Sequence, residues 1–250
     1  MSHQQRIADL SRSLASHPVF EAEYFKAICD HSWNKDGYAV HRANFFDRTA
    51  LTVPAIATVC ARAAEARDQY TLTFFSYILS EESGNGDPER SHPLLMETSH
   101  NLFGENVFGL EPLRVCEAKD SSLIVSGTRQ YKARLRRLCN GSYQRLLGAA
   151  MALELHAEHM LSHCRTAFRA HAAGCRTSEF ERDIEMYFNV HLNGVEARHA
   201  ADARKCVEIN CKTDGDVAEV AAGAEETLAA QMEMWRDLHE TMKTIGGYYV

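Results

Sequence analysis

The sequence predicts an all-α protein, folded as one helical bundle of about seven to nine helices. Apolar residues recur at the spacing of an α-helix along most of the chain, and runs that alternate like a β-strand are few. The 250 residues include only 5 prolines, and we find no repeat and no low-complexity linker. Residues 1–250 are therefore expected to form a single domain.

The first helices are expected from the residues that break them. A helix is predicted from Ser2 to Ala15, followed by a break at His17-Pro18 and a second helix through Phe20 to Asp30. A loop is expected at Asn34 to Gly37, because Asn, Asp and Gly favour turns. An apolar segment around Phe45 follows this loop.

The middle helices are expected to begin at proline or at capping residues. Val53-Pro54 marks a helix start, since proline is tolerated in the first turn. Asp68 is expected to cap the next helix, which ends at the breaker Ser83 to Gly86. Ser91 to Pro93 begins another helix, whereas Gly104 to Pro112 is expected to be irregular.

The second half of the chain is expected to be helical almost throughout. A long helical region is predicted from Ser121 to His171, with an interruption near Asn140-Gly141. Thr177-Ser178 opens a further helix. Lys212 to Asp216 form a turn before a final amphipathic helix that ends near Met242.

The composition argues against several classes of protein. The net charge is −7 with a pI near 6.0 and no basic block, so nucleic acid is not an expected partner. No apolar run approaches the roughly 18 residues of a membrane span, and MSHQQRIADLSRS lacks the apolar core of a signal peptide. The 8 cysteines are scattered without a CxxC pair, which favours reduced thiols over disulfides or zinc. A cytoplasmic protein is therefore expected.

The most informative stretch is YFNVHLNGVEARHA, which places His191, Glu196 and His199 within about two helical turns. Two imidazoles and a carboxylate this close are typical iron ligands. Glu196 and His199 share one side of a helix, but His191 is rotated from Glu196 by about 140°. A π-bulge or an equivalent irregularity, which Gly194 would tolerate, restores convergence and is expected between them. The alternative is a polar helix face with unrelated histidines.

Two earlier acidic segments add candidate ligands. Glu81 and Glu82 end a predicted helix, where the helix dipole disfavours negative charge, so a buried carboxylate there needs a cation. A solvated acidic pair is the alternative. His92 follows the Gly-rich turn and can face the same pocket as Glu82. The sequence leaves open whether Glu81 replaces Glu82.

A third acidic segment lies on the long helix. Glu154 follows the small and apolar residues Gly148 to Leu153, and a carboxylate on such a face is costly to bury unless it is paired or metal-bound. Glu158 lies on the same face and remains the alternative ligand.

Together these segments resemble the heme-oxygenase-like diiron oxidases. That family has an acid before a Gly-rich turn, a histidine about ten residues on, a glutamate on a later helix, and a YFxxHxxxDxxHA-like segment. The resemblance covers about Ser16 to Ala200, and the first interval of the last segment is one residue longer here, with glutamate in place of aspartate. The matching positions are Glu82, His92, Glu154, His191, Glu196 and His199.

The resemblance implies a heme-oxygenase-like fold whose six matching residues hold two Fe(II) ions, with O₂ as co-substrate. It implies oxidation of a free aliphatic amino acid in natural-product biosynthesis, by desaturation and in some members by azetidine-type ring closure. N-oxygenation, C–C cleavage and nitrile formation are alternatives on the same scaffold. The chain has no flavin or nicotinamide fingerprint, so an external electron donor is expected unless the substrate supplies the electrons. A homodimer is left open.

Other classes of function remain to be weighed. A metal-free, thiaminase-like hydrolase or binding protein would use a cysteine, with Cys139 or Cys164 nearest by sequence. A heme protein would use one histidine as axial ligand, and a helical interaction module would need none of these residues. Six ligand-type residues in family order favour the diiron oxidase. The substrate carboxylate needs a cation, for which the candidates are Arg129, Arg134 and Arg198.

Overall fold

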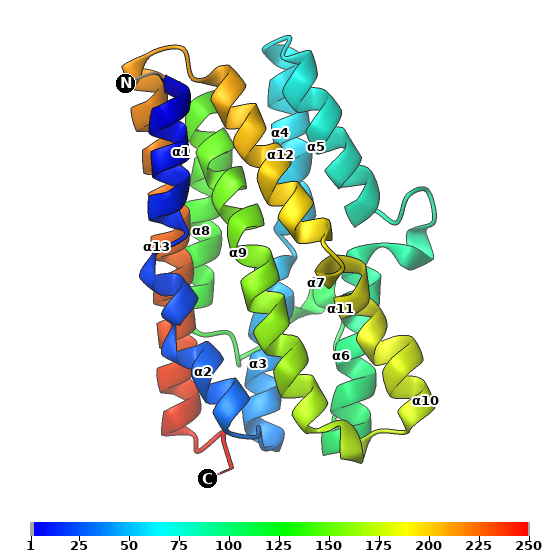
Figure 1. Cartoon of the computed structure of the whole chain (residues 1–250). Coiled ribbons are helices and arrows are strands. Elements are labelled where there is room, and N and C mark those ends of the chain that lie inside the picture. Colours follow the sequence, from blue (N-terminus) through cyan, green and yellow to red (C-terminus); the bar gives the residue numbers. More distant parts are fainter. Residues whose placement is uncertain (1–2, 250) are drawn as a thin grey trace.

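The computed structural model describes residues 3–249 and confirms the predicted all-α class. Within that range the extended pairing is limited to one antiparallel bridge, between Trp33 and Tyr248. The longest helices, α9 (Tyr143–Ala170) and α13 (Asp214–Thr244), pack side by side along the bundle. The helix α12 (Val195–Asn210) also packs against α9, and α1 (His3–Leu14) contacts both α12 and α13 (Figure 1).

The N-terminal elements follow the predicted breaks with one correction. They are α1 (His3–Leu14), the 3₁₀ turn η1 (Pro18–Glu21), α2 (Glu23–Asp30) and α3 (Lys35–Thr49). Ser2 lies outside the described residues. The loop expected at Asn34 to Gly37 is wrong, because the Asn34 side chain accepts a hydrogen bond from the Gly37 amide and caps α3. Turn-forming residues here start a helix.

The middle elements begin where the sequence predicts. They are α4 (Thr52–Glu65), α5 (Gln69–Glu82), η2 (Pro88–Arg90) and α6 (His92–Phe108). The Asp68 side chain accepts from the Thr71 amide and caps α5. The stretch expected to be irregular from Gly104 remains helical to Phe108, because Gly104 lets α6 pass close to Tyr38, and the chain leaves the helix only at Gly109, with φ of 60°.

The C-terminal half contains α7 (Val115–Ala118), α8 (Ser126–Cys139), α9, η3 (Ala172–Gly174), α10 (Thr177–Glu179), a π-helical turn at Phe180–Ile184, α11 (Glu185–Leu192), α12 and α13. The predicted interruption at Asn140-Gly141 separates α8 from α9. The predicted turn before the last helix is a capping box, in which Thr213 and Asp216 exchange side-chain and backbone hydrogen bonds. None of the helices within residues 3–249 is long and apolar enough to cross a membrane.

Two glycines bring α9 and α13 into backbone contact. A Cβ atom on Gly148 would lie 2.0 Å from the Val220 carbonyl oxygen, and one on Gly223 would lie 2.0 Å from that of Arg145. Only glycine therefore allows this approach. The contact fixes the position of α9 in the core, one and a half turns before Glu154.

Candidate metal centre

The structure brings all six predicted residues together from five helices. Each side chain is buried, with between 0% and 7% of the residue exposed. Glu82 is the last residue of α5 and His92 the first of α6, so the Gly-rich turn between these helices sets both. The others lie on α9 (Glu154), α11 (His191) and α12 (Glu196 and His199).

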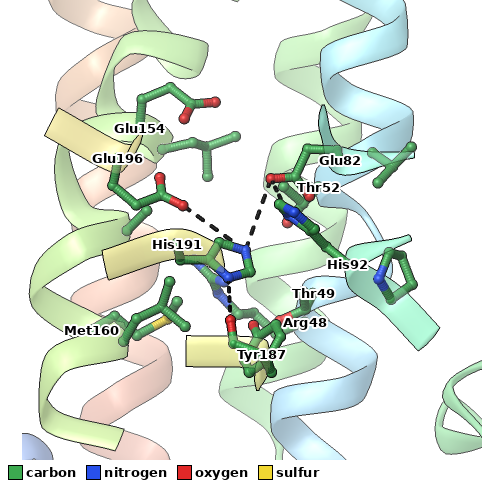
Figure 2. A pocket seen from close by; sticks show the side chains of 15 residues that line it. Arg48, Thr49, Thr52, Glu82, His92, Glu154, Met160, Tyr187, His191 and Glu196 are labelled. Carbon is green, nitrogen blue, oxygen red and sulfur yellow. Dashed lines mark hydrogen bonds and ion pairs between the residues drawn. The ribbon is translucent and has the colours of Figure 1, made fainter. Parts of the chain in front are cut away.

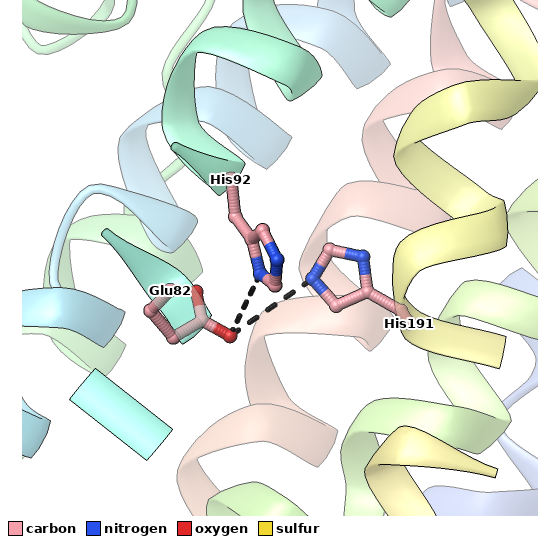
Figure 3. A group of neighbouring side chains, drawn as sticks. All are labelled: Glu82, His92 and His191. Atoms are coloured by element: carbon pink, nitrogen blue, oxygen red, sulfur yellow. Dashed lines mark ion pairs between the residues drawn. The ribbon is translucent and has the colours of Figure 1, made fainter. Parts of the chain in front are cut away.

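The first group consists of Glu82, His92 and His191, whose ligand atoms lie within 4.8 Å of one another (Figure 3). The Glu82 Oε1 atom is 3.0 Å from His92 Nδ1 and 4.0 Å from His191 Nε2. His92 Nδ1 is buried and faces this Glu82 oxygen. Two imidazoles and one carboxylate thus converge on one point.

The second group consists of Glu154, Glu196 and His199, again within 4.8 Å of one another. His199 Nδ1 lies 3.6 Å from Glu154 Oε2 and 3.8 Å from Glu196 Oε2. This nitrogen is also buried without a hydrogen-bond partner in the described part of the chain. A buried, unpartnered nitrogen that faces two carboxylates fits the role of a metal ligand.

Glu196 contacts both groups. Its Oε1 lies 3.9 Å from His191 Nε2 of the first group (Figure 2). Its Oε2 lies 3.8 Å from His199 Nδ1 of the second. One carboxylate therefore joins the two clusters, with one oxygen available to each.

The outer nitrogens of two histidines are held by partners outside the groups. His191 Nδ1 lies 2.6 Å from the Tyr187 carbonyl oxygen, which fixes its Nε2 toward Glu82 and Glu196. His199 Nε2 lies 2.8 Å from Glu81 Oε2. Such partners orient a metal-binding imidazole and set its tautomer.

Glu81 and Glu82 consequently have different positions. Glu82 points into the first group, whereas Glu81 contacts the far side of His199 and pairs with Arg198, at 2.7 and 2.9 Å. The alternative that Glu81 replaces Glu82 does not fit this geometry. Glu158, the alternative to Glu154, is exposed to solvent one turn beyond the buried Glu154. It therefore does not fit the role of a ligand in this site.

The electrostatics of the site favour a bound cation. Burial raises the pKa of Glu196 well above its usual value, and the nearby carboxylates of Glu154 and Glu82 raise it further. Burial also raises the pKa of Glu154. For His199, burial favours the neutral form, but Glu154, Glu81 and Glu196 outweigh it and raise the pKa to about 9. Buried carboxylates in such proximity are costly unless a positive charge lies between them.

The predicted irregularity between His191 and Glu196 is confirmed. Helix α11 ends at Leu192 and α12 begins at Val195, with Gly194 in the left-handed region at φ of 82°. Of the two forms expected, a π-bulge or an equivalent irregularity, the structure has the second, a full break that redirects α12. A π-helical turn does occur, but at Phe180–Ile184.

Comparison with known families agrees with this site. Residues 37–232 match the family model described as iron-containing redox enzyme. The chain belongs to this family of iron-containing redox enzymes. The matched residues contain all six donors and the whole of the five helices that carry them.

Solved structures show the fold of this iron-containing redox enzyme. A CADD-like protein of unknown function from Nostoc punctiforme, at 1.35 Å resolution, superposes with a TM-score of 0.72 and 17% identity, over 96% of this chain and 97% of that chain. A domain of unknown function with a heme oxygenase-like fold, from Shewanella denitrificans, gives 0.63 and 18%, over 97% and 92%. The expected heme-oxygenase-like fold is thus confirmed. No curated protein matches the sequence significantly.

The donor sets suit iron. Glu82, His92 and His191 form a set of two histidines and one carboxylate, which is typical of non-heme Fe(II) enzymes that keep coordination positions open. The second group offers one histidine and two carboxylates, and neither group contains a thiolate. Imidazole and carboxylate ligands therefore fit the metal that names the family.

A small cavity of about 50 Å³ adjoins the donors (Figure 2). All of the donors except His199 border it, together with an apolar wall formed by Val53, Leu153, Met160 and Leu161. Arg48 and Thr49 at the end of α3 also line it. Neither of these two residues was predicted from the sequence.

The three arginines proposed from the sequence lie elsewhere. Arg129 is exposed, Arg134 pairs with Glu233 at 2.7 Å, and Arg198 pairs with Glu81. None of them lines the cavity. No sequence signal singles out Arg48, because it is one of three consecutive polar residues, Asp47 to Thr49, at the end of a helix that is polar at about half of its positions.

Proposed function

We propose that this iron-containing redox enzyme is an O₂-dependent non-heme diiron oxidase that acts on a C–H bond of a free aliphatic amino acid. The observation that carries the proposal is the pair of buried donor groups joined by Glu196. Two Fe(II) ions held there would supply the activation of O₂, which side chains alone do not perform. Desaturation is the expected first outcome.

The chain's own residues divide the work. Glu82, His92 and His191 would hold one ion, and Glu154 and His199 the other, with Glu196 between them. Burial of all six keeps bulk water from the reacting atoms, which strengthens each electrostatic interaction and protects reactive species. The Tyr187 carbonyl orients His191, and Glu81 orients His199, each through the ring nitrogen that faces away from the donor groups.

The cavity supports a small substrate with an apolar body. Val53, Leu153, Met160 and Leu161 line its wall and would pack against a branched aliphatic side chain. Packing on this wall would fix which C–H bond faces the donors, and small shifts in that position change which bond reacts.

The electron balance requires a donor. Removal of one hydrogen from each of two adjacent carbons supplies two electrons and two protons to O₂ and leaves an alkene. Two further electrons and two protons from an external reductant complete the reduction of O₂ to two water molecules. Ring closure, in which a C–N bond replaces a C–H and an N–H bond, has the same balance. The position in which the cavity holds the substrate decides between desaturation and ring closure.

The metal-free hydrolase finds little support in the positions of its cysteines. Cys139 borders a small apolar cavity that also contacts Glu154, but burial raises the pKa of its thiol. Cys164 is fully buried, and burial raises its pKa as well. A nucleophilic cysteine needs the opposite shift, since the thiolate is the reactive form.

The proposed function is tested by anaerobic Fe(II) loading followed by O₂ and reductant with isoleucine, valine, leucine, lysine or tryptophan. Oxygen uptake and product mass are measured, and His199→Ala serves as the control without a complete site. We expect a two-hydrogen loss from an aliphatic member. If no amino acid supports O₂ consumption despite full iron loading, the proposed function is wrong.

A further inference from the structure

Arg48 is a buried arginine without a carboxylate partner in the described part of the chain. Only 5% of the residue is exposed, at the C-terminal end of α3. The adjacent Asp47 does not neutralise it, because Asp47 pairs with Lys132 of α8. A buried charge without a counterion is unfavourable, so such a residue is suited to bind an anionic ligand.

The hydrogen bonds of Arg48 leave donors free. Its Nη2 donates to Gln231 Oε1 of α13 at 3.1 Å, and its guanidinium lies 5.7 Å from the centre of the Tyr131 ring. Its Nε has no hydrogen-bond partner within residues 3–249, although it is buried. Because a guanidinium carries five N–H donors, Gln231 and Tyr131 position the group without saturating it.

Thr49 adds a second unpartnered group at the same place. Its Oγ1 is buried and has no hydrogen-bond partner among the described residues. Both Thr49 and Arg48 line the cavity that reaches Glu82, His191 and Glu196. Figure 2 shows the two residues beside Tyr187, on the opposite side of the cavity from Glu154.

We propose that Arg48 and Thr49 bind the carboxylate of the substrate, and that this enzyme therefore selects small aliphatic molecules with a single carboxylate. The guanidinium supplies the charge and the threonine hydroxyl supplies one further hydrogen bond. That the molecule with this carboxylate is an amino acid rests on the proposed function. The anchor itself rests only on the cavity and its unpartnered donors.

The chemistry of the cavity favours a carboxylate over other anions. One guanidinium and one hydroxyl match a singly charged group, whereas a phosphate carries more charge toward Glu82 and Glu196. With the carboxylate at Arg48, the aliphatic body lies along the wall formed by Val53, Leu153, Met160 and Leu161. The competing arrangement, in which the carboxylate binds a metal directly, gives Arg48 no part in recognition.

The test compares binding of four probes to the iron-loaded, anaerobic protein and to the metal-free protein. The probes are L-isoleucine, 3-methylpentanoate, L-isoleucinamide and 2-methylbutylamine, of which only the first two carry a carboxylate. We expect both carboxylates to bind the wild type at least about tenfold more tightly than the amide and the amine. Equal binding of all four probes would overturn the inference without any variant.

Variants then locate the preference. Arg48→Met should remove the carboxylate preference, and Arg48→Lys should keep part of it, while the affinity for 2-methylbutylamine stays unchanged. Arg42→Lys is the matched control, since Arg42 is a buried arginine of α3 that donates to Asn101 and to the Glu111 carbonyl, outside the cavity. Far-ultraviolet circular dichroism and iron content check that each variant folds. If Arg48→Met does not fold, the carboxylate preference of Arg48→Lys provides the test.

The outcomes separate this inference from the proposed function. If Arg48→Lys and Arg48→Met bind iron and retain the wild-type carboxylate preference, the anchor is wrong, although amino-acid oxidation still stands. If the preference depends on Arg48 but no amino acid supports O₂ uptake, the anchor stands and the proposed function falls. Thr49→Val should weaken both carboxylates several-fold.

Discussion

Glu196 Oε1 lies 3.9 Å from His191 Nε2 across the break between α11 and α12. On one continuous helix these side chains would diverge by about 140°. The break at Gly194 therefore allows α12 to carry Glu196 and His199 into a site that α11 also reaches. Local backbone geometry here decides whether two donor groups or one can form.

Gly194→Ala tests this dependence on the break. Gly194 has φ of 82°, and a Cβ there meets no atom within 4 Å, so the change adds backbone strain without a clash. We expect a loss of about 1 kcal/mol in the free energy of unfolding and weaker binding of iron. Gly109→Ala, at φ of 60° in open space at the end of α6, should cost the same stability but leave iron content unchanged. Equal iron binding in both variants would contradict the role given to Gly194.

Glu81→Gln tests how His199 is held. Glu81 Oε2 lies 2.8 Å from His199 Nε2. The neutral amide of the glutamine variant should orient the imidazole less strongly than this carboxylate does. We expect about 10- to 100-fold weaker binding at one of the two iron sites, with the other unchanged. The control is Glu65→Gln, which removes a carboxylate from the surface pair with Arg62. Anaerobic titration that gave two equal, wild-type affinities would rule out this role.

The stability of the fold should fall in acid because of His41. This histidine is fully buried beside the Tyr24 hydroxyl, at 2.5 Å, and burial lowers its pKa to about 3. The unfolded chain binds the proton near pH 6.5, so stability is present above that pH and is lost as the pH falls toward 3. We expect a loss of about 2 kcal/mol between pH 7 and pH 5 from this group.

Urea unfolding of the metal-free protein at a series of pH values measures this effect. His41→Gln should have lower stability at pH 7 but a shallower decline toward pH 5. Other buried histidines, His100 and His156, contribute to the decline that remains, because burial also lowers their pKa values. An identical slope in wild type and variant would show that His41 takes up no additional proton on unfolding.

Gly148→Ala should damage the fold through the contact of α9 with α13. A Cβ there would lie 2.0 Å from the Val220 carbonyl oxygen, so the two helices must separate. We expect a loss of roughly 3 kcal/mol or more in the free energy of unfolding, as for other overpacked cores. Gly215→Ala is the control, because its nearest neighbour, Thr213 Oγ1, lies at 3.6 Å and its position in α13 favours alanine. Thermal unfolding of the two variants should therefore shift in opposite directions.

The sequence predicts the helical class and the donor residues because both depend on local patterns. Helical periodicity, the cap at Asp68 and the Gly-rich turn that follows Glu82 are all readable within a few residues. The extra residue before Glu196 likewise predicts an irregular backbone. Its form was not predicted, because a π-bulge and a break at Gly194 satisfy the same spacing.

Features that depend on distant segments were not predictable. The role of Arg48 depends on Gln231 and on the cavity wall, which come together only in the folded bundle. Its neighbour Asp47 suggests a surface ion pair, whereas the structure pairs Asp47 with Lys132. Asn34 has the residues of a turn around it, yet it caps a helix whose stability comes from tertiary packing.

Metal content after anaerobic Fe(II) loading shows whether two iron ions bind to the two donor groups. Iron per chain is measured for the wild type, His191→Ala and His199→Ala after removal of weakly bound metal. We expect two ions in the wild type and at most one in each variant, with no turnover by either variant. Two ions and full activity in His199→Ala would overturn the assignment of the donors.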